Sequence, residues 1–254
     1  MPVISAYDRL TDRVYGRARS LIAPEVRNSQ YAYAERLREA LAGSGRWLDI
    51  GCGHDFLPAW LPPQQHELNL ARWQSVGIDM DATALARHRG LRHRTVANGE
   101  QLPFEANSFD LITANMVVEH VADPERLFAE ISRVLAPGGR VLVHTPNIHG
   151  YTTAITRRLP QPWLGPLAQA LLGRKPEDVY PTYYRANSAD VLSNVAAQAG
   201  LIIESCEFVN SSPQAIRIPP LMVLELLLMR SLRAPLAARY RPCLLVSLRN
   251  PAHT

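Results

Sequence analysis

The sequence predicts an α/β protein built on a parallel sheet with helices covering both faces. Two observations support this fold class. Short runs of strand length alternate with segments of helical spacing from residue 46 to residue 143. The runs are also apolar almost throughout, as in strands that are buried on both sides. Successive strand–helix–strand units then give parallel strands joined by right-handed crossovers.

The first half of the chain supplies most of these elements. Helices are expected over residues 7–21, 31–41, 82–89 and 123–135, and strands over residues 47–50, 76–79, 94–97, 108–113 and 141–143. The crossover after the first strand, residues 54–75, contains Pro58, Pro62 and Pro63, which break a long helix. We therefore expect a short helix, a loop and a second helical piece near residues 67–73.

The second half is less regular. A helix is expected from residue 189, after a cap at Asn187-Ser188, and strands over residues 201–209 and 242–248. The 254 residues are expected to form a single domain. Its parts are N-terminal helices (1–44), a core (45–150), an irregular insertion that serves as a lid or substrate wall (151–186) and a helix–strand part (187–254).

Composition excludes several classes of protein. The net charge is +4 and the basic residues are spread along the chain without a dense run, so a nucleic-acid partner is not expected. Three widely spaced cysteines favour a reducing cytoplasm. No cluster has the spacing of metal ligands. The longest apolar run, residues 221–229, is too short to span a bilayer, so we expect a soluble protein whose oligomeric state is open.

A pair of glycines follows the first predicted strand. Gly51 and Gly53 allow the tight turn and the close backbone approach that a ligand requires, and Asp49 is an acid within the apolar strand. A dinucleotide-binding turn is one alternative, but its fingerprint needs a third Gly or Ala where this chain has Phe56. Alone, the pair is also compatible with an ordinary loop.

Six motifs occur in order along the chain: Leu48-Asp49-Ile50-Gly51-Cys52-Gly53, Gly77-Ile78-Asp79, Leu102-Pro103-Phe104, Ser108-Phe109-Asp110, Glu119-His120-Val121 and Arg133-Val134-Leu135-Ala136-Pro137-Gly138-Gly139. In this order they resemble a known family, the class I S-adenosylmethionine-dependent methyltransferases of the type 11 small-molecule group. The resemblance implies a Rossmann-like seven-stranded sheet, mostly parallel with one antiparallel late strand. It also implies S-adenosylmethionine as cofactor and a small or amphiphilic substrate.

The resemblance assigns roles at the strand ends. Asp79 accepts the two ribose hydroxyls of the cofactor, although an acid there could also cap the next helix, as Asp81 could. Gly51 and Gly53 let the backbone pack beside the ribose and the amino-acid tail. Asp49 organises the turn or meets the ammonium group of the tail through water.

Three further residues are assigned to the adenine. Met80 lies against the ring face, although a methionine there is equally compatible with ordinary packing. Asn98 and Gly99 meet the adenine edge, and Asn98 stands where the family often has Asp, so its amide oxygen replaces a charged acceptor. The family also often has a glycine where this chain has Asp55, which predicts a wider first loop.

Catalysis is assigned to His120, the candidate general base after the fourth strand, with packing or capping as the alternative role. Asn115 is expected to line the cofactor cleft, and His149 is a weaker candidate base. The expected function is direct methyl transfer to a small or amphiphilic molecule. The alternative is a non-catalytic S-adenosylmethionine-binding partner or sensor, which the fold alone does not exclude.

The apolar helix expected from Leu221 has two interpretations. It is either buried over the sheet between the late strands, or it forms an apolar surface rimmed by arginine together with Trp163 and Leu164 of the insertion. The second interpretation places the protein at the inner face of the membrane, resting on anionic lipid.

Overall fold

The computed structural model describes residues 6–158 and 181–251, which form two compact units. The sheet unit comprises Gln30–Pro146, Thr182–Glu207 and Leu244–Thr254. The helical unit comprises Met1–Ser29, Asn147–Pro181 and Phe208–Cys243. The insertion residues expected to form a lid, 159–180 with Trp163 and Leu164 among them, lie outside the described residues.

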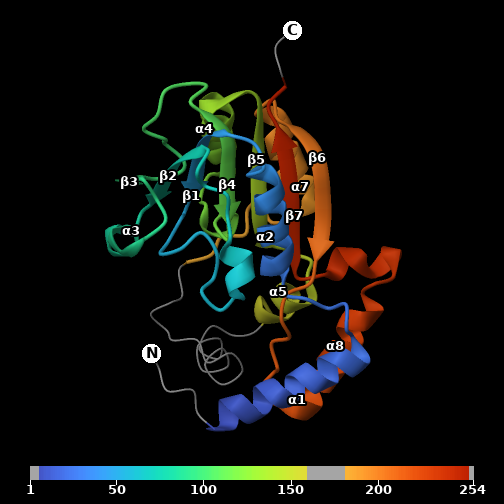
Figure 1. Cartoon of the computed structure of the whole chain (residues 1–254). Coiled ribbons are helices and arrows are strands. Elements are labelled where there is room, and N and C mark those ends of the chain that lie inside the picture. The colour runs from blue at the N-terminus through green and yellow to red at the C-terminus, as the bar shows by residue number, and fades with distance from the viewer. Residues whose placement is uncertain (1–5, 159–180, 252–254) are drawn as a thin grey trace. The chain divides into compact units, whose positions relative to one another are not determined.

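The sheet has seven strands in the order β3-β2-β1-β4-β5-β7-β6 (Figure 1). They are β1 (Gly45–Ile50), β2 (Trp73–Asp79), β3 (His93–Val96), β4 (Phe109–Asn115), β5 (Leu135–Pro146), β6 (Ile202–Val209) and β7 (Cys243–Arg249). The first five pair in parallel. The Gly138 N–H donates to the Asn250 carbonyl and the Asn250 N–H donates to the Gly139 carbonyl, both at 2.9 Å, so β7 runs antiparallel to β5. The predicted fold class is confirmed.

Helices cover both faces of this sheet. The sheet-unit helices are α2 (Ser29–Ala40), α3 (Ala82–Arg87), α4 (Pro124–Val134) and α7 (Ala189–Gln198). In Figure 1, α4 and α7 lie on one face, where they contact each other, and α2 lies on the other. The predicted caps are present, because the side chains of Asp81, Asp123 and Ser188 each accept a backbone N–H in the first turn of α3, α4 and α7.

The crossover after β1 differs from the sequence prediction. Its helical element is a short 3-10 helix, Pro63–His66, and no helix forms near residues 67–73. Trp73 instead begins β2, where it pairs with Gly45 and its indole N–H donates to the Leu41 carbonyl at 3.1 Å. These contacts of Trp73 hold the end of the crossover in an extended conformation. The spacing of apolar residues in the sequence does not show such contacts, and therefore suggested a helix.

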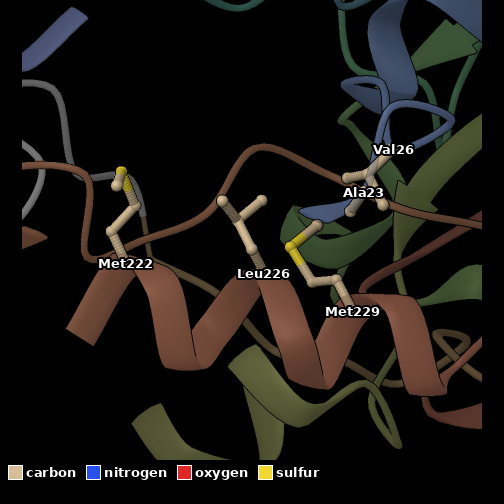
Figure 2. Packing of buried hydrophobic residues seen from close by; sticks show 5 residues of the cluster. All are labelled: Ala23, Val26, Met222, Leu226 and Met229. Atoms are coloured by element: carbon tan, nitrogen blue, oxygen red, sulfur yellow. The ribbon is translucent and has the colours of Figure 1, made fainter. Parts of the chain in front are cut away.

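The helical unit contains α1 (Ala6–Ile22), α5 (Tyr151–Thr156), α8 (Pro219–Ser231) and the 3-10 helix η4 (Pro235–Tyr240). Its core joins three α8 residues to the turn after α1, and consists of Ala23, Val26, Met222, Leu226 and Met229 (Figure 2). The Glu225 carboxylate accepts the Tyr151 hydroxyl at 2.8 Å and two backbone N–H groups of the loop before α8.

α8 has packing partners within its own unit. Its buried side packs on α1, Ala23 and Val26 within the helical unit. Within the described residues, no helix has the length and apolar character needed to cross a membrane.

Candidate active site

The candidate site residues come together at the carboxyl ends of neighbouring parallel strands. β1 lies between β2 and β4, and Ile50 is in register with Ile78 on one side and Ala114 on the other. The loops that follow these three strands therefore start side by side. In open α/β sheets this edge is where ligands bind.

The glycine turn after β1 needs glycine at both positions for different reasons. Gly51 and Gly53 have φ angles of +63° and +56°, in the left-handed region that disfavours other residues. A Cβ on Gly51 would also collide with the Val117 side chain, which lies in the loop after β4. A Cβ on Gly53 would meet no atom within 4 Å. Open space therefore lies beside the backbone of Gly53.

Asp79 ties the end of β2 to this turn. Its Oδ2 accepts the Gly53 N–H at 2.9 Å and its Oδ1 accepts the Asp81 N–H at 2.8 Å. Asp81, and not Asp79, caps α3. Each oxygen of an ionised carboxylate has about two acceptor sites, so both Asp79 oxygens keep capacity for one more donor.

Asp49 lies inside the sheet, beneath the turn. Its side chain is buried and accepts the Thr113 hydroxyl at 2.5 Å, and that hydroxyl oxygen in turn accepts the Trp47 indole N–H at 2.8 Å. Burial raises the pKa of Asp49 to about 7, the nearby Asp79 carboxylate adds to the rise, and the Thr113 hydrogen bond opposes it. The carboxyl is thus balanced between its protonated and ionised forms near neutral pH.

Asn115, at the end of β4, belongs to a partly buried amide pair. Its Nδ2 donates to Gln30 Oε1 at 3.0 Å, and Gln30 Nε2 donates back to Asn115 Oδ1 at 3.1 Å. The same Asn115 oxygen lies 2.8 Å from His144 Nδ1. An amide oxygen only accepts, so this orientation places the proton on Nδ1 and leaves Nε2 unprotonated.

His144 is completely enclosed. Burial lowers its pKa to about 3, so the ring is neutral at ordinary pH. The ring stacks on Tyr33 of α2 with a centroid distance of 5.7 Å. Burial also raises the pKa of Tyr33 well above its ordinary value, and the Asp49 carboxylate reinforces that rise. The stacked Tyr33 and His144 rings are therefore uncharged and fully buried.

The proposed adenine residues have separate local roles in this structure. The Asn98 side-chain oxygen accepts the Glu100 N–H at 3.0 Å, which shapes the loop after β3. A Cβ on Gly99 would lie 2.9 Å from Leu127 and 3.3 Å from Ile50, so close packing explains the glycine. Met80 is 73% exposed. A role for these three residues at the adenine stays a prediction.

His120 ends the short 3-10 helix Val118–His120 in the loop after β4. Its side chain is partly exposed, and its Nε2 lies 3.9 Å from Oε1 of the buried Glu119. Burial raises the pKa of Glu119, while the nearby His120 and a 3.0 Å hydrogen bond from the Thr145 hydroxyl act in the opposite direction. The loop therefore presents a reachable imidazole backed by an enclosed carboxyl group.

Comparison with known proteins identifies the domain. Residues 48–143 match the family described as "Methyltransferase domain", of the type 11 group. The chain carries a class I S-adenosylmethionine-dependent methyltransferase domain. This match confirms the predicted family, and with it S-adenosylmethionine as the cofactor.

Curated relatives share this methyltransferase domain. A malonyl-[acyl-carrier protein] O-methyltransferase of Alcanivorax borkumensis is 36% identical over 116 residues, which cover 44% of this chain and 38% of the relative. A ubiquinone biosynthesis O-methyltransferase of Hahella chejuensis is 35% identical over 118 residues, 43% of this chain and 46% of the relative. The matches thus span less than half the length of these relatives.

A solved structure extends the fold match beyond the methyltransferase domain. The geranyl diphosphate C-methyltransferase of Streptomyces coelicolor, solved with S-adenosyl-L-homocysteine, is 19% identical, with a TM-score of 0.50. The alignment covers 87% of this chain and 76% of that protein. At this identity the similarity shows the fold.

The residues of the methyltransferase domain fit its cofactor. Open space beside Gly53 would hold the amino-acid tail, and Asp79 offers acceptors that suit a ribose diol. Among the described residues, no group of three His, Cys, Asp or Glu side chains could hold a metal ion.

The sequence analysis did not identify three residues whose side chains contact Asp49, Asn115 and His144: Thr113, Gln30 and Tyr33. Thr113 carried a signal that could have been used, because it is a hydroxyl residue in an apolar strand, directly opposite Asp49 in the β1–β4 pairing. Gln30 and Tyr33 carried no such signal, since helical spacing does not show which strand end a helix will contact.

Proposed function

We propose that this protein transfers the methyl group of S-adenosylmethionine directly to a small or amphiphilic metabolite. The observation that supports this most is the 2.9 Å hydrogen bond between the Gly53 N–H and Asp79, which joins a ligand-accommodating turn to a hydroxyl-accepting carboxylate. The relatives are named for O-methylation of malonyl-[acyl-carrier protein] and for O-methylation in ubiquinone biosynthesis, which supports acyl-chain or quinone-like acceptors.

We assign each part of the cofactor to residues of a different loop. Asp79 accepts the ribose hydroxyls, and the backbone of Gly51 and Gly53 borders the ribose and the tail. Asn98 and Gly99 meet the adenine edge, with Met80 against its face. When it is ionised, the Asp49 carboxylate favours binding of the ammonium group of the cofactor's amino-acid tail. Asn115 forms part of the wall of the cofactor cleft.

When bound, S-adenosylmethionine supplies a methyl carbon already activated for displacement, so positioning provides much of the rate. An oxygen nucleophile must also lose its proton. We propose that His120 accepts that proton, because its imidazole is partly exposed beside the cofactor loops. When it is ionised, the Glu119 carboxylate, whose Oε1 lies 3.9 Å from His120 Nε2, would stabilise the resulting imidazolium.

Calorimetry with S-adenosylmethionine and S-adenosylhomocysteine tests the binding half of this proposal. Asp79→Ala removes an acceptor of two hydrogen bonds and should weaken both ligands by about 2–3 kcal/mol, roughly 30- to 150-fold. Asp190→Ala, at an exposed carboxylate on α7, is the matched control and should bind as the native protein does. Failure of the native protein to bind either ligand would refute the proposal.

Incubation with methyl-labelled cofactor and with metabolite and lipid extracts tests the transfer half. A labelled product that His120→Ala forms more slowly supports an enzyme with a histidine base. Cofactor binding without any labelled product would instead favour the non-catalytic sensor.

A further inference from the structure

α8 leaves one side uncovered by the described residues. Met222, Leu226 and Met229 face the core of the helical unit, while four leucines on the other side remain exposed: Leu221, Leu224, Leu227 and Leu228. Their spacing of three, four and seven residues places them on one helical face. Leu224 is the most exposed of the four, at 62%. We name these four side chains the leucine face.

α1 carries a second exposed apolar stripe, and this one contains cations. Leu10, Val14 and Leu21 are exposed along one side of the helix, and Arg13 and Arg17 fall between them at the same helical spacing. Apolar groups alternating with arginine are typical of helices at a membrane surface, because the long arginine side chain lets its charge reach the headgroups while the stem stays among apolar groups.

Charge is divided unequally between the two units. The helical-unit ranges 6–29, 147–158 and 208–243 contain twelve arginines and four acidic residues, a formal charge of +8. The sheet-unit ranges 30–146, 182–207 and 244–251 contain thirteen arginines and seventeen acidic residues, a formal charge of −4. An anionic surface would therefore attract the helical unit and repel the sheet unit.

We propose that the helical unit binds the surface of an anionic lipid bilayer through the leucine face of α8 and the Leu10–Leu21 stripe of α1. Anionic headgroups match the +8 charge, and the hydrocarbon boundary accepts the exposed leucines. Nucleic acid would satisfy the arginines but leave the leucines in water. A second copy of the chain would cover leucines but bring like charges together.

The proposal goes beyond methyl transfer, because lipid binding needs no cofactor and no substrate. Its test is sedimentation of the full-length protein with vesicles of phosphatidylcholine alone or mixed equally with phosphatidylglycerol. The protein should pellet with the mixed vesicles at low salt, at least tenfold more than with phosphatidylcholine alone. High salt should reduce this binding, because it screens the charge attraction.

Two pairs of variants locate the surface. Leu224→Ser with Leu227→Ser should lower vesicle binding at least tenfold, whereas Val191→Ser with Ile202→Ser, at similarly exposed apolar positions of the sheet unit, should not change it. Arg13→Gln with Arg17→Gln should lower binding roughly 25-fold, since each arginine near the surface contributes about fivefold. The control Arg87→Gln with Arg89→Gln changes two exposed arginines of the sheet unit.

Circular dichroism and cofactor calorimetry on every variant separate loss of lipid binding from loss of folding. A native protein that stays in the supernatant with mixed vesicles at low salt overturns the proposal. So does binding that the leucine variant retains in full. A leucine variant that converts a dimer to a monomer without any vesicle effect would assign this surface to a second copy of the chain.

Discussion

Asp49 and His144 should each make the free energy of unfolding depend on pH, with opposite signs, so that the two effects cancel in the native protein. The pKa of buried Asp49 is raised from 3.8 to about 7, so the folded state holds a proton there that the unfolded state has lost. The free energy of unfolding therefore falls as pH rises between these values. The pKa of buried His144 is lowered from 6.5 to about 3, so here the unfolded state holds the extra proton and stability rises with pH.

The magnitude follows from the overlap of the two windows. Between pH 4.5 and 6.5 each group changes the free energy of unfolding by about 1.36 kcal/mol per pH unit, with opposite sign. Over two units, each contribution is on the order of 2.7 kcal/mol. Asp49→Asn removes the falling contribution, so its stability relative to the native protein should rise by that amount from pH 4.5 to 6.5. His144→Gln should show the reverse, falling by the same amount.

Urea unfolding at pH 4.5, 5.5 and 6.5, followed by circular dichroism, measures both differences. Asp190→Asn, at an exposed carboxylate, serves as the control, and its difference from the native protein should stay nearly constant. If Asp49→Asn and His144→Gln also keep a constant offset at all three pH values, the buried groups do not have the inferred pKa values. Slopes of the same sign for the two variants would equally refute the reasoning.

The remaining predictions concern the turn and the base. Gly51→Ala should destabilise the protein by several kcal/mol, because a left-handed backbone and contact with Val117 both oppose it. Gly53→Ala meets only the backbone cost, about 1–2 kcal/mol, and should mainly weaken cofactor binding; urea unfolding and calorimetry separate the two. His120→Ala should lower kcat at least tenfold with little change in cofactor affinity; a change within about twofold would assign the histidine a structural role.

The sheet was predictable because its strands carry local signals. Apolar runs ending in glycine or acid marked β1 and β2, and the cap residues Asp81 and Asp123 marked the starts of α3 and α4. The crossover before Trp73 was not predictable, because contacts with distant residues decide its conformation. For the same reason, the sequence placed Asp49 and Asp79 at one edge but did not show the hydrogen bonds that hold them.

The charge distribution shows a different kind of limit. Along the chain the arginines look evenly spread, and no dense basic run exists. The helical unit gathers them by combining three separate stretches, so its charge becomes visible only once the chain folds. The uniform apolar character of α8 likewise did not show which side would be buried.

The pairing of α1 with α8 has a consequence during protein synthesis. About 200 residues separate the end of α1 at Ile22 from the start of α8 at Pro219. At about 5–20 residues per second, α1 waits on the order of 10–40 s for its partner to be translated. Most of the stability of a helix in a protein comes from tertiary packing of its apolar side, which α1 lacks until α8 exists. During that interval the apolar side that later meets α8 is exposed, and the parallel strands β1 to β5 can pair before α8 is translated, whereas β7 follows α8 in the chain and joins the sheet later.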